Sequence, residues 1–143
     1  MGTQRKAEVV WHGTLTEGGG TIVSATSGAL PQLPVSWPSR SEEPNGKTSP
    51  EELIAAAHAA CFAMALSAGV GEAGFTPETL ETSSTVTFEP GVGITTAHLT
   101  VRGTVPGMTA DEFQFAAEGA KAGCPVSQAL AGVEITLHAE LAG

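Results

Sequence analysis

The chain has 143 residues, of which 41% are hydrophobic and 15% are charged, and this balance is typical of one soluble globular domain. Fifteen acidic residues against six basic ones give a formal net charge of −9, so the surface repels nucleic acid and anionic lipid headgroups. We therefore expect a single domain over residues 1–143 with neither nucleic-acid nor membrane partners.

The N-terminal segment predicts a β-hairpin. Residues 7–12 are typical of a strand, and Gly18-Gly19-Gly20 predicts a turn into a second strand over residues 21–24. From residue 27 to residue 49 the density of proline and glycine is too high for a helix or a central strand, and we expect a long ordered loop. A loop of this length is usually functional or disordered, and the presence of Trp37 and Arg40 favours the functional interpretation.

The strongest structural signal begins at Ser49. The sequence Ser49-Pro50-Glu51-Glu52 combines a helix cap, a proline in the first turn and a glutamate three residues after the cap. It predicts a helix as far as Ala68, where the following glycines weaken it. Because this helix is apolar on nearly all sides, a single sheet covers only part of it, and a second subunit is expected to cover the rest.

The C-terminal half predicts a second hairpin, a second helix and a final strand. Thr109-Ala110-Asp111-Glu112 repeats the capping pattern at the start of the second helix. The expected elements are strands over 80–89 and 93–105, helices over 113–122 and 124–130, and a strand over 133–139. The order of elements indicates an α+β fold with largely antiparallel strand pairing.

Cys61 and Cys124 are the two cysteines of the chain. Taken singly, Cys61 among alanines in mid-helix is typical of a buried, inert thiol, and Cys124 before a proline is typical of a packing residue or a reactive thiol. No apolar signal core and no uninterrupted run of 18 apolar residues is evident, which predicts a cytoplasmic protein. In the cytoplasm a disulfide is usually transient and catalytic, so the pair favours redox chemistry.

A reactive Cys61 needs a cation or hydrogen-bond donors nearby, because the thiolate is the nucleophile and burial disfavours it. Arg40 is the best candidate cation, and the alternative is a solvated loop arginine. Glu51 is explained first by helix capping, with an arginine-orienting role as its alternative. His58 and Cys61, three residues apart, would form half of a metal site, but no CxxC or HxxxH pattern accompanies them.

Two segments resemble a known family. Residues 49–67, SPEELIAAAHAACFAMALS, and residues 120–130, AKAGCPVSQAL, closely resemble the osmotically inducible protein C / organic hydroperoxide resistance (OsmC/Ohr) family, and the resemblance extends over essentially the whole chain. It implies an α+β fold with a long buried central helix, in an intertwined homodimer with two active sites at the interface. It also implies a thiol peroxidase that reduces organic hydroperoxides, and hydrogen peroxide less well.

The resemblance also implies the site residues. By motif match Cys61 is the peroxidatic cysteine, Cys124 is the resolving cysteine and Glu51 is the glutamate of the family. One branch of the family places its arginine in the N-terminal hairpin, where this chain has Glu17-Gly18-Gly19-Gly20. The osmotically inducible branch places it on the loop before the helix, which Ser39-Arg40-Ser41 matches, and we assign the chain to that branch.

The implied cycle needs thiols and no metal, flavin or haem. Arg40 stabilises the Cys61 thiolate, which attacks a peroxide and becomes a sulfenic acid, and Cys124 condenses with it to a disulfide. An external dithiol, such as a lipoylated protein or a small dithiol, then reduces that disulfide. No cofactor is expected.

The substrate and the competing functions follow from the same residues. Apolar walls supplied by Trp37, Phe62 and Met64 predict that bulky apolar hydroperoxides react faster than hydrogen peroxide. The alternative from another class is a non-enzymatic stress protein that binds a small apolar ligand, with incidental cysteines. A hydrolase that uses Cys61 and His58 is disfavoured, because one rigid helix face leaves no place for a third orienting group.

Helix geometry predicts which chain supplies Glu51. Ten residues of helix place Glu51 and Cys61 about 15 Å apart along the axis and roughly 80° apart around it, so the two cannot meet within one straight helix. Either the chain bends, or an antiparallel copy of the helix from a second subunit brings its N-terminal end to Cys61. The apolar surface of residues 53–66 independently favours the second subunit, and we expect an obligate homodimer.

Overall fold

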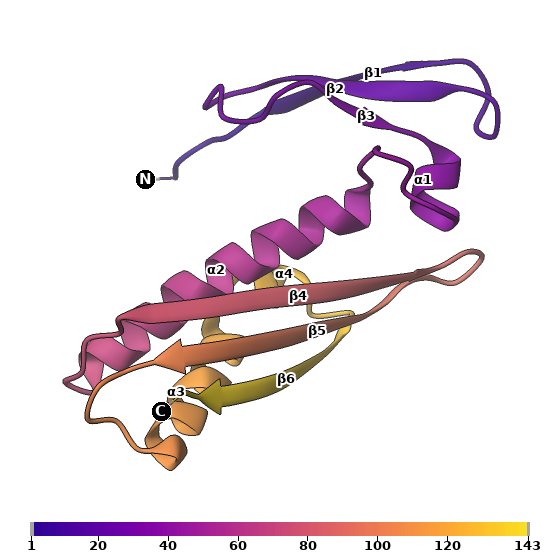
Figure 1. Cartoon of the computed structure of the whole chain (residues 1–143). Coiled ribbons are helices and arrows are strands. Elements are labelled where there is room, and N and C mark those ends of the chain that lie inside the picture. The colour runs from indigo at the N-terminus through magenta and orange to yellow at the C-terminus, as the bar shows by residue number, and fades with distance from the viewer. Residues whose placement is uncertain (1, 143) are drawn as a thin grey trace. The chain divides into compact units, whose positions relative to one another are not determined.

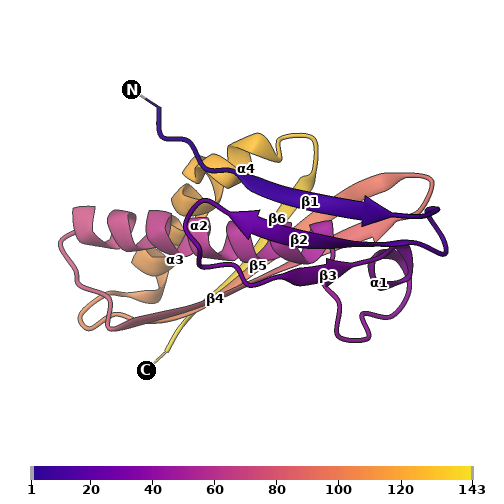
Figure 2. The ribbon, with the colours of Figure 1, turned by 90° about the horizontal axis from the view of Figure 1, so that it is seen from above.

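The computed structural model describes residues 2–142, which divide into two compact units, Met1–Leu53 and Ile54–Gly143. The N-terminal unit contains a three-stranded antiparallel sheet in the order β1-β2-β3 (Figure 2). Its strands are β1 (Ala7–His12), β2 (Gly19–Ala25) and β3 (Leu33–Val35). The predicted hairpin is confirmed, but Gly19 and Gly20 belong to β2 and not to the turn. Gly20 lies opposite Trp11, and a Cβ atom there would come within 2.7 Å of the indole.

The proline-rich segment after this hairpin is not only a loop. It contains β3 and a five-residue helix, α1 (Trp37–Ser41), so the prediction that no helix forms here was wrong. Pro38 lies in the first turn, where its missing N–H group costs no helical hydrogen bond. Ser36 and Ser39 cap the turn reciprocally, each side-chain oxygen accepting from the backbone N–H of the other at 3.0–3.1 Å. Arg40 is therefore held by a capped helix.

Helix α2 (Pro50–Glu72) begins as the sequence predicts and ends later. The Ser49 hydroxyl oxygen accepts a hydrogen bond from the backbone N–H of Glu52 at 3.1 Å, which confirms the cap. The helix continues past Gly69, because a glycine in a helix costs only about 1 kcal/mol. It ends before Gly74, whose φ of +93° is in the left-handed region that favours glycine.

The C-terminal unit builds its sheet in the order β4-β5-β6 (Figure 1). Its elements after α2 are β4 (Thr79–Glu89), β5 (Gly93–Thr104), α3 (Ala110–Gly123), α4 (Pro125–Ala129) and β6 (Glu134–Leu141). Strands β4 and β5 form the predicted antiparallel hairpin, and the capping box at Thr109 opens α3 as expected. Strand β6, however, pairs parallel with β5, because the chain returns through a helical crossover. The α+β class and the predominance of antiparallel pairs are confirmed.

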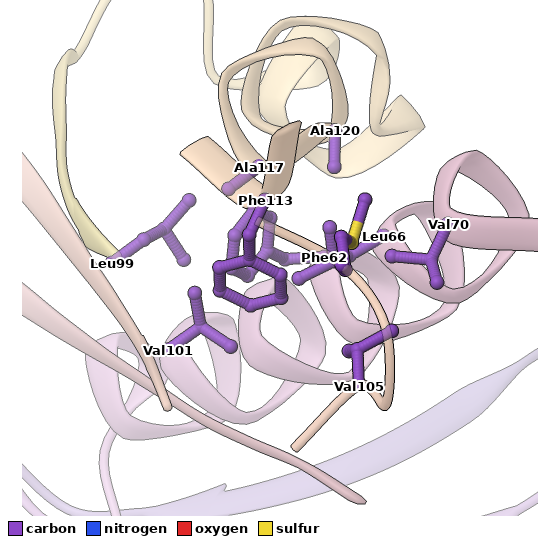
Figure 3. Packing of buried hydrophobic residues seen from close by; sticks show 10 residues of the cluster. Phe62, Leu66, Val70, Leu99, Val101, Val105, Phe113, Ala117 and Ala120 are labelled. Atoms are coloured by element: carbon purple, nitrogen blue, oxygen red, sulfur yellow. The ribbon is translucent and has the colours of Figure 1, made fainter. Parts of the chain in front are cut away.

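The hydrophobic core of this unit lies between α2, α3 and one face of the sheet (Figure 3). Its most buried side chains are Phe62, Leu66 and Val70 from α2, Leu99 and Val101 from β5, and Phe113 and Ala117 from α3. The ring of Phe113 packs on Gly103, where a Cβ atom would lie 2.5 Å from the ring. Phe62 is fully buried here, so the prediction that it walls a substrate pocket was wrong.

Outside this core, α2 leaves much of its apolar surface exposed. Its most apolar 18-residue window has a mean hydropathy of 1.9, and 22% of that window is buried. Among the described residues, α2 is the one helix long and apolar enough to cross a membrane, but the core helix of a soluble protein meets the same criterion. Met64 on α2 and Phe115 on α3 are 73% and 83% exposed. Exposed apolar side chains of this size are typical of an interaction surface.

Candidate active site

The two cysteines, far apart in the sequence, meet in the C-terminal unit. Cys61 lies in the middle of α2. Cys124 is both the C-cap residue of α3 and the N-cap residue of α4. Both are free thiols, and each one shifts the pKa of the other, so the two lie close together. The fold thus brings two reduced thiols from distant parts of the sequence to one place, as disulfide formation requires.

The two thiols differ in their access to solvent. Cys124 is fully buried, whereas Cys61 is partly exposed. Ala57 and Met64, which are neighbours of Cys61 on the helix surface, are both exposed. A reagent that arrives from solvent therefore reaches Cys61 first and meets an apolar surface around it.

The surroundings also separate the pKa values of the two thiols. Burial raises the pKa of Cys61, and so does its hydrogen bond to Cys124, while the backbone N–H of Val126 acts in the opposite direction. Burial alone would raise the pKa of Cys124 too, but donors from Cys61, Ser127 and Val126 outweigh it and lower that pKa. Because burial disfavours the anion at Cys61, a thiolate there needs an additional positive charge beside it.

Arg40 and Glu51, the other two residues singled out in the sequence, are brought together in the N-terminal unit. The Arg40 Nε atom lies 3.1 and 3.0 Å from the two carboxylate oxygens of Glu51, and the second terminal nitrogen lies 2.9 Å from one of them. Glu51 is 6% exposed, and the side chain of Arg40 is 32% exposed. This fork geometry fixes the guanidinium plane, and the Arg40 side chain stays partly exposed to solvent.

Sequence reasoning did not predict the buried contact that His58 makes with α4. His58 is fully buried, and its Nε2 atom lies 2.7 Å from the hydroxyl oxygen of Ser127 on α4. Burial lowers the pKa of His58, so the imidazole is neutral at physiological pH. The available signal was the position of both residues one helical turn from a cysteine. Within residues 2–142 no group of three His, Cys, Asp or Glu side chains could hold a metal ion.

A groove of about 900 Å³ lies between α2 and α3, but it contains neither cysteine. Small and apolar residues dominate its lining, among them Ala65, Ala68, Gly69, Phe115, Ala116 and Gly119.

The structure is a mixed α+β fold in which two free cysteines lie close together. Residues 43–138 match the family described as OsmC-like protein, and the chain belongs to that family. Proteins named Peroxiredoxin OsmC from Escherichia coli (strain K12) and Shigella flexneri are each 46% identical over 144 residues, with 99% of both chains covered.

Solved structures agree with this assignment. An organic hydroperoxide resistance protein OsmC from Legionella pneumophila is 25% identical with a TM-score of 0.66, and the match covers 94% of this chain and 96% of that one. The organic hydroperoxide resistance protein OhrB of Bacillus subtilis is 25% identical with a TM-score of 0.63, and here the match covers 96% and 98%. The whole chain therefore follows the fold of this family.

Proposed function

We propose that the protein is a thiol peroxidase that reduces organic hydroperoxides to alcohols through a disulfide cycle. Its relatives at 46% identity are named peroxiredoxins, and the solved relatives from Legionella and Bacillus are named organic hydroperoxide resistance proteins. The observation that carries the proposal is the contact between a partly exposed thiol, Cys61, and a fully buried one, Cys124. This pair has one thiol that peroxide can reach and one that can resolve the product.

In the first step the Cys61 thiolate attacks the distal oxygen of the hydroperoxide. The O–O bond breaks, the sulfur gains OH and becomes a sulfenic acid, and the alkoxide leaves and takes a proton to give the alcohol. In the second step the Cys124 thiolate attacks the Cys61 sulfur, the S–O bond breaks and hydroxide leaves as water with one proton from solvent. An external dithiol, such as a lipoylated protein, then reduces the disulfide by thiol exchange.

Arg40 supplies the positive charge that Cys61 lacks, and Glu51 orients it. Their bidentate pair leaves part of the guanidinium accessible, so it can contact both the thiolate and the peroxide. Helix α2 is continuous between Glu51 and Cys61, and its rise separates the two by about 15 Å along the axis. The pair therefore reaches Cys61 from a second subunit.

The second subunit also accounts for the exposed apolar surface. Met64 and Phe115 are mostly exposed in one chain, and Val9, Val10 and Trp11 of β1 are 40–56% exposed. Burial of these side chains in a homodimer removes apolar area from water and stabilises the assembly. In this proposal the whole chain works as one domain of a cytoplasmic homodimer, with each site built from both chains.

The first test is peroxide consumption in the presence of a dithiol. The unaltered protein is expected to turn over tert-butyl hydroperoxide, Cys61→Ser is expected to be inactive, and Cys124→Ser is expected to consume one equivalent and stop at an oxidised Cys61. Turnover by Cys61→Ser would reverse the two roles. If the unaltered protein consumes no peroxide, the alternative of a non-enzymatic protein that binds small apolar ligands is favoured.

The second test asks which chain supplies Glu51. Cys61→Ser and Glu51→Ala chains are refolded together and compared with each variant refolded alone. Because mixed dimers contain one site with both residues intact, they are expected to regain part of the activity. Mixed dimers no more active than the parents, or a monomer in sedimentation, would contradict the shared site.

A further inference from the structure

We propose that His58 and Ser127 are positioning residues for the resolving cysteine: His58 orients the Ser127 hydroxyl toward the sulfur of Cys124 and so speeds disulfide formation. The inference rests on the proposed two-cysteine cycle. It concerns residues that peroxide does not touch, and it assigns a purpose to a fully buried histidine that the peroxide step leaves unused.

The placement of the two residues is tied to the two cysteines. His58 lies one helical turn before Cys61 on α2, and Ser127 lies one turn after Cys124 on α4. The 2.7 Å contact between His58 Nε2 and Ser127 Oγ therefore joins the two helices beside the pair of sulfur atoms. The hydroxyl and the backbone N–H group of Ser127 both lower the pKa of the Cys124 thiol, which places them on the side of its sulfur.

Burial fixes the direction of these hydrogen bonds. The Nδ1 atom of His58 is buried and has no hydrogen-bond partner in the described structure. An unpartnered lone pair is less costly there than an unpartnered N–H group, so the neutral ring carries its proton on Nε2. His58 then donates to the Ser127 oxygen, and the hydroxyl proton of Ser127 is left to donate to Cys124.

This chain of donors acts on the second step of the cycle. The Cys124 sulfur must be an anion to attack the Cys61 sulfenic acid, and a hydroxyl donor stabilises that anion. In the attack the Cys124 sulfur is oxidised, the Cys61 sulfur is reduced, and the hydroxide that leaves takes its proton from solvent on the exposed side of Cys61. The ionisable groups placed against Cys124 are Cys61 directly and His58 through Ser127.

The consequence is protection of Cys61 against over-oxidation. A sulfenic acid that waits for its partner can react with a second peroxide and become a sulfinic acid, which a dithiol does not reverse. A faster second step shortens that wait. His58 and Ser127 are therefore expected to set the peroxide concentration at which the enzyme inactivates, and not the rate of its first step.

The experiment follows the two steps separately with quenched-flow mass spectrometry after one equivalent of tert-butyl hydroperoxide. Ser127→Ala and His58→Leu remove a donor, whereas Ser127→Thr keeps the hydroxyl and His58→Gln keeps an amide N–H near the position of Nε2. Ser127→Ala and His58→Leu each leave one buried polar side chain without its partner and can therefore lose the fold. The double variant His58→Leu/Ser127→Ala removes both polar side chains and avoids this problem. Circular dichroism and the rate of sulfenic acid formation report the integrity of each protein.

In Ser127→Ala, His58→Leu and the double variant, disulfide formation is expected to slow by about tenfold, which is the effect of one hydrogen bond to a charged group. The pH profile of disulfide formation shifts to higher pH by about one unit, and sulfinic acid appears at lower peroxide concentration. The first step keeps its rate, and Ser127→Thr and His58→Gln recover most of the second.

Two results overturn the inference, and they are distinguishable. Disulfide formation at the unaltered rate and pH profile in Ser127→Ala and in the double variant contradicts the role of the donor chain while the peroxidase cycle stands. Failure of the unaltered protein to form the Cys61–Cys124 disulfide contradicts the proposed function, and the inference falls with it.

Discussion

The Arg40–Glu51 pair allows a stability prediction worked from its geometry. The carboxylate is 6% exposed and accepts three hydrogen bonds of 2.9–3.1 Å from the guanidinium. Removing one partner of a fully buried pair costs about 3–5 kcal/mol. Because the Arg40 side chain is 32% exposed, water reaches part of the group left behind, and we expect Arg40→Ala to cost about 2–3 kcal/mol.

A double-mutant cycle separates this pair from the other contacts of each residue. The cycle uses Arg40→Ala, Glu51→Gln and the double variant, with Arg40→Lys as a control that keeps the charge and loses the fork. The free energy of unfolding is measured in urea by circular dichroism at one protein concentration, since the stability of a dimer depends on concentration. We expect a coupling energy of about 1.5–2 kcal/mol and a loss of about 1 kcal/mol in Arg40→Lys. A coupling energy below about 0.5 kcal/mol, the value of a surface pair, would refute the reasoning.

Three further predictions each concern a single residue. Gly103→Ala is expected to lower the free energy of unfolding by about 1–3 kcal/mol in the same urea assay, because its new methyl group overlaps the ring of Phe113, and an unchanged midpoint would contradict this packing. Burial holds the pKa of His58 below its ordinary 6.5, so the stability that the neutral ring contributes is complete above pH 6.5 and is lost as the pH falls through that value. The slope is at most about 1.4 kcal/mol per pH unit in urea titrations, and His58→Gln should flatten it. Met64→Gln, beside Cys61, is expected to lower kcat/KM for cumene hydroperoxide more than for hydrogen peroxide, because each apolar methylene of a substrate gains about 0.8 kcal/mol on burial; equal loss for both peroxides would count against an apolar substrate site.

Most of the fold was predictable because its signals are local. The caps at Ser49 and Thr109 and the hairpin formed by residues 80–89 and 93–105 each depend on residues close together in the chain, and the structure contains all three elements where the sequence placed them. The short helix α1 was missed because proline density argues against helices in general, although Pro38 occupies the one turn that tolerates it. The parallel pairing of β6 was missed because strand direction depends on the crossover and not on the strand itself.

The candidate site, like the fold, was predictable only in part. Residue types and motif positions singled out Cys61, Cys124, Arg40 and Glu51 in the sequence, and the structure brings each pair into contact. Local pattern gave no indication that Phe62 faces the core, because the helix is apolar on nearly every side. The contact of a residue on α2 with Ser127 on α4 depends on tertiary packing, which no spacing within either segment encodes.

A reversible disulfide between Cys61 and Cys124 changes the mass of the protein, and this change can be measured after reaction with peroxide. The reduced protein is treated with one equivalent of tert-butyl hydroperoxide, its mass is measured intact, and it is then digested without reduction. The account predicts a loss of about 2 Da, a peptide pair joined through Cys61 and Cys124, and restoration of the original mass by a dithiol. An unchanged mass, or a stable gain of about 16 or 32 Da on a cysteine with no linked peptides, would contradict it.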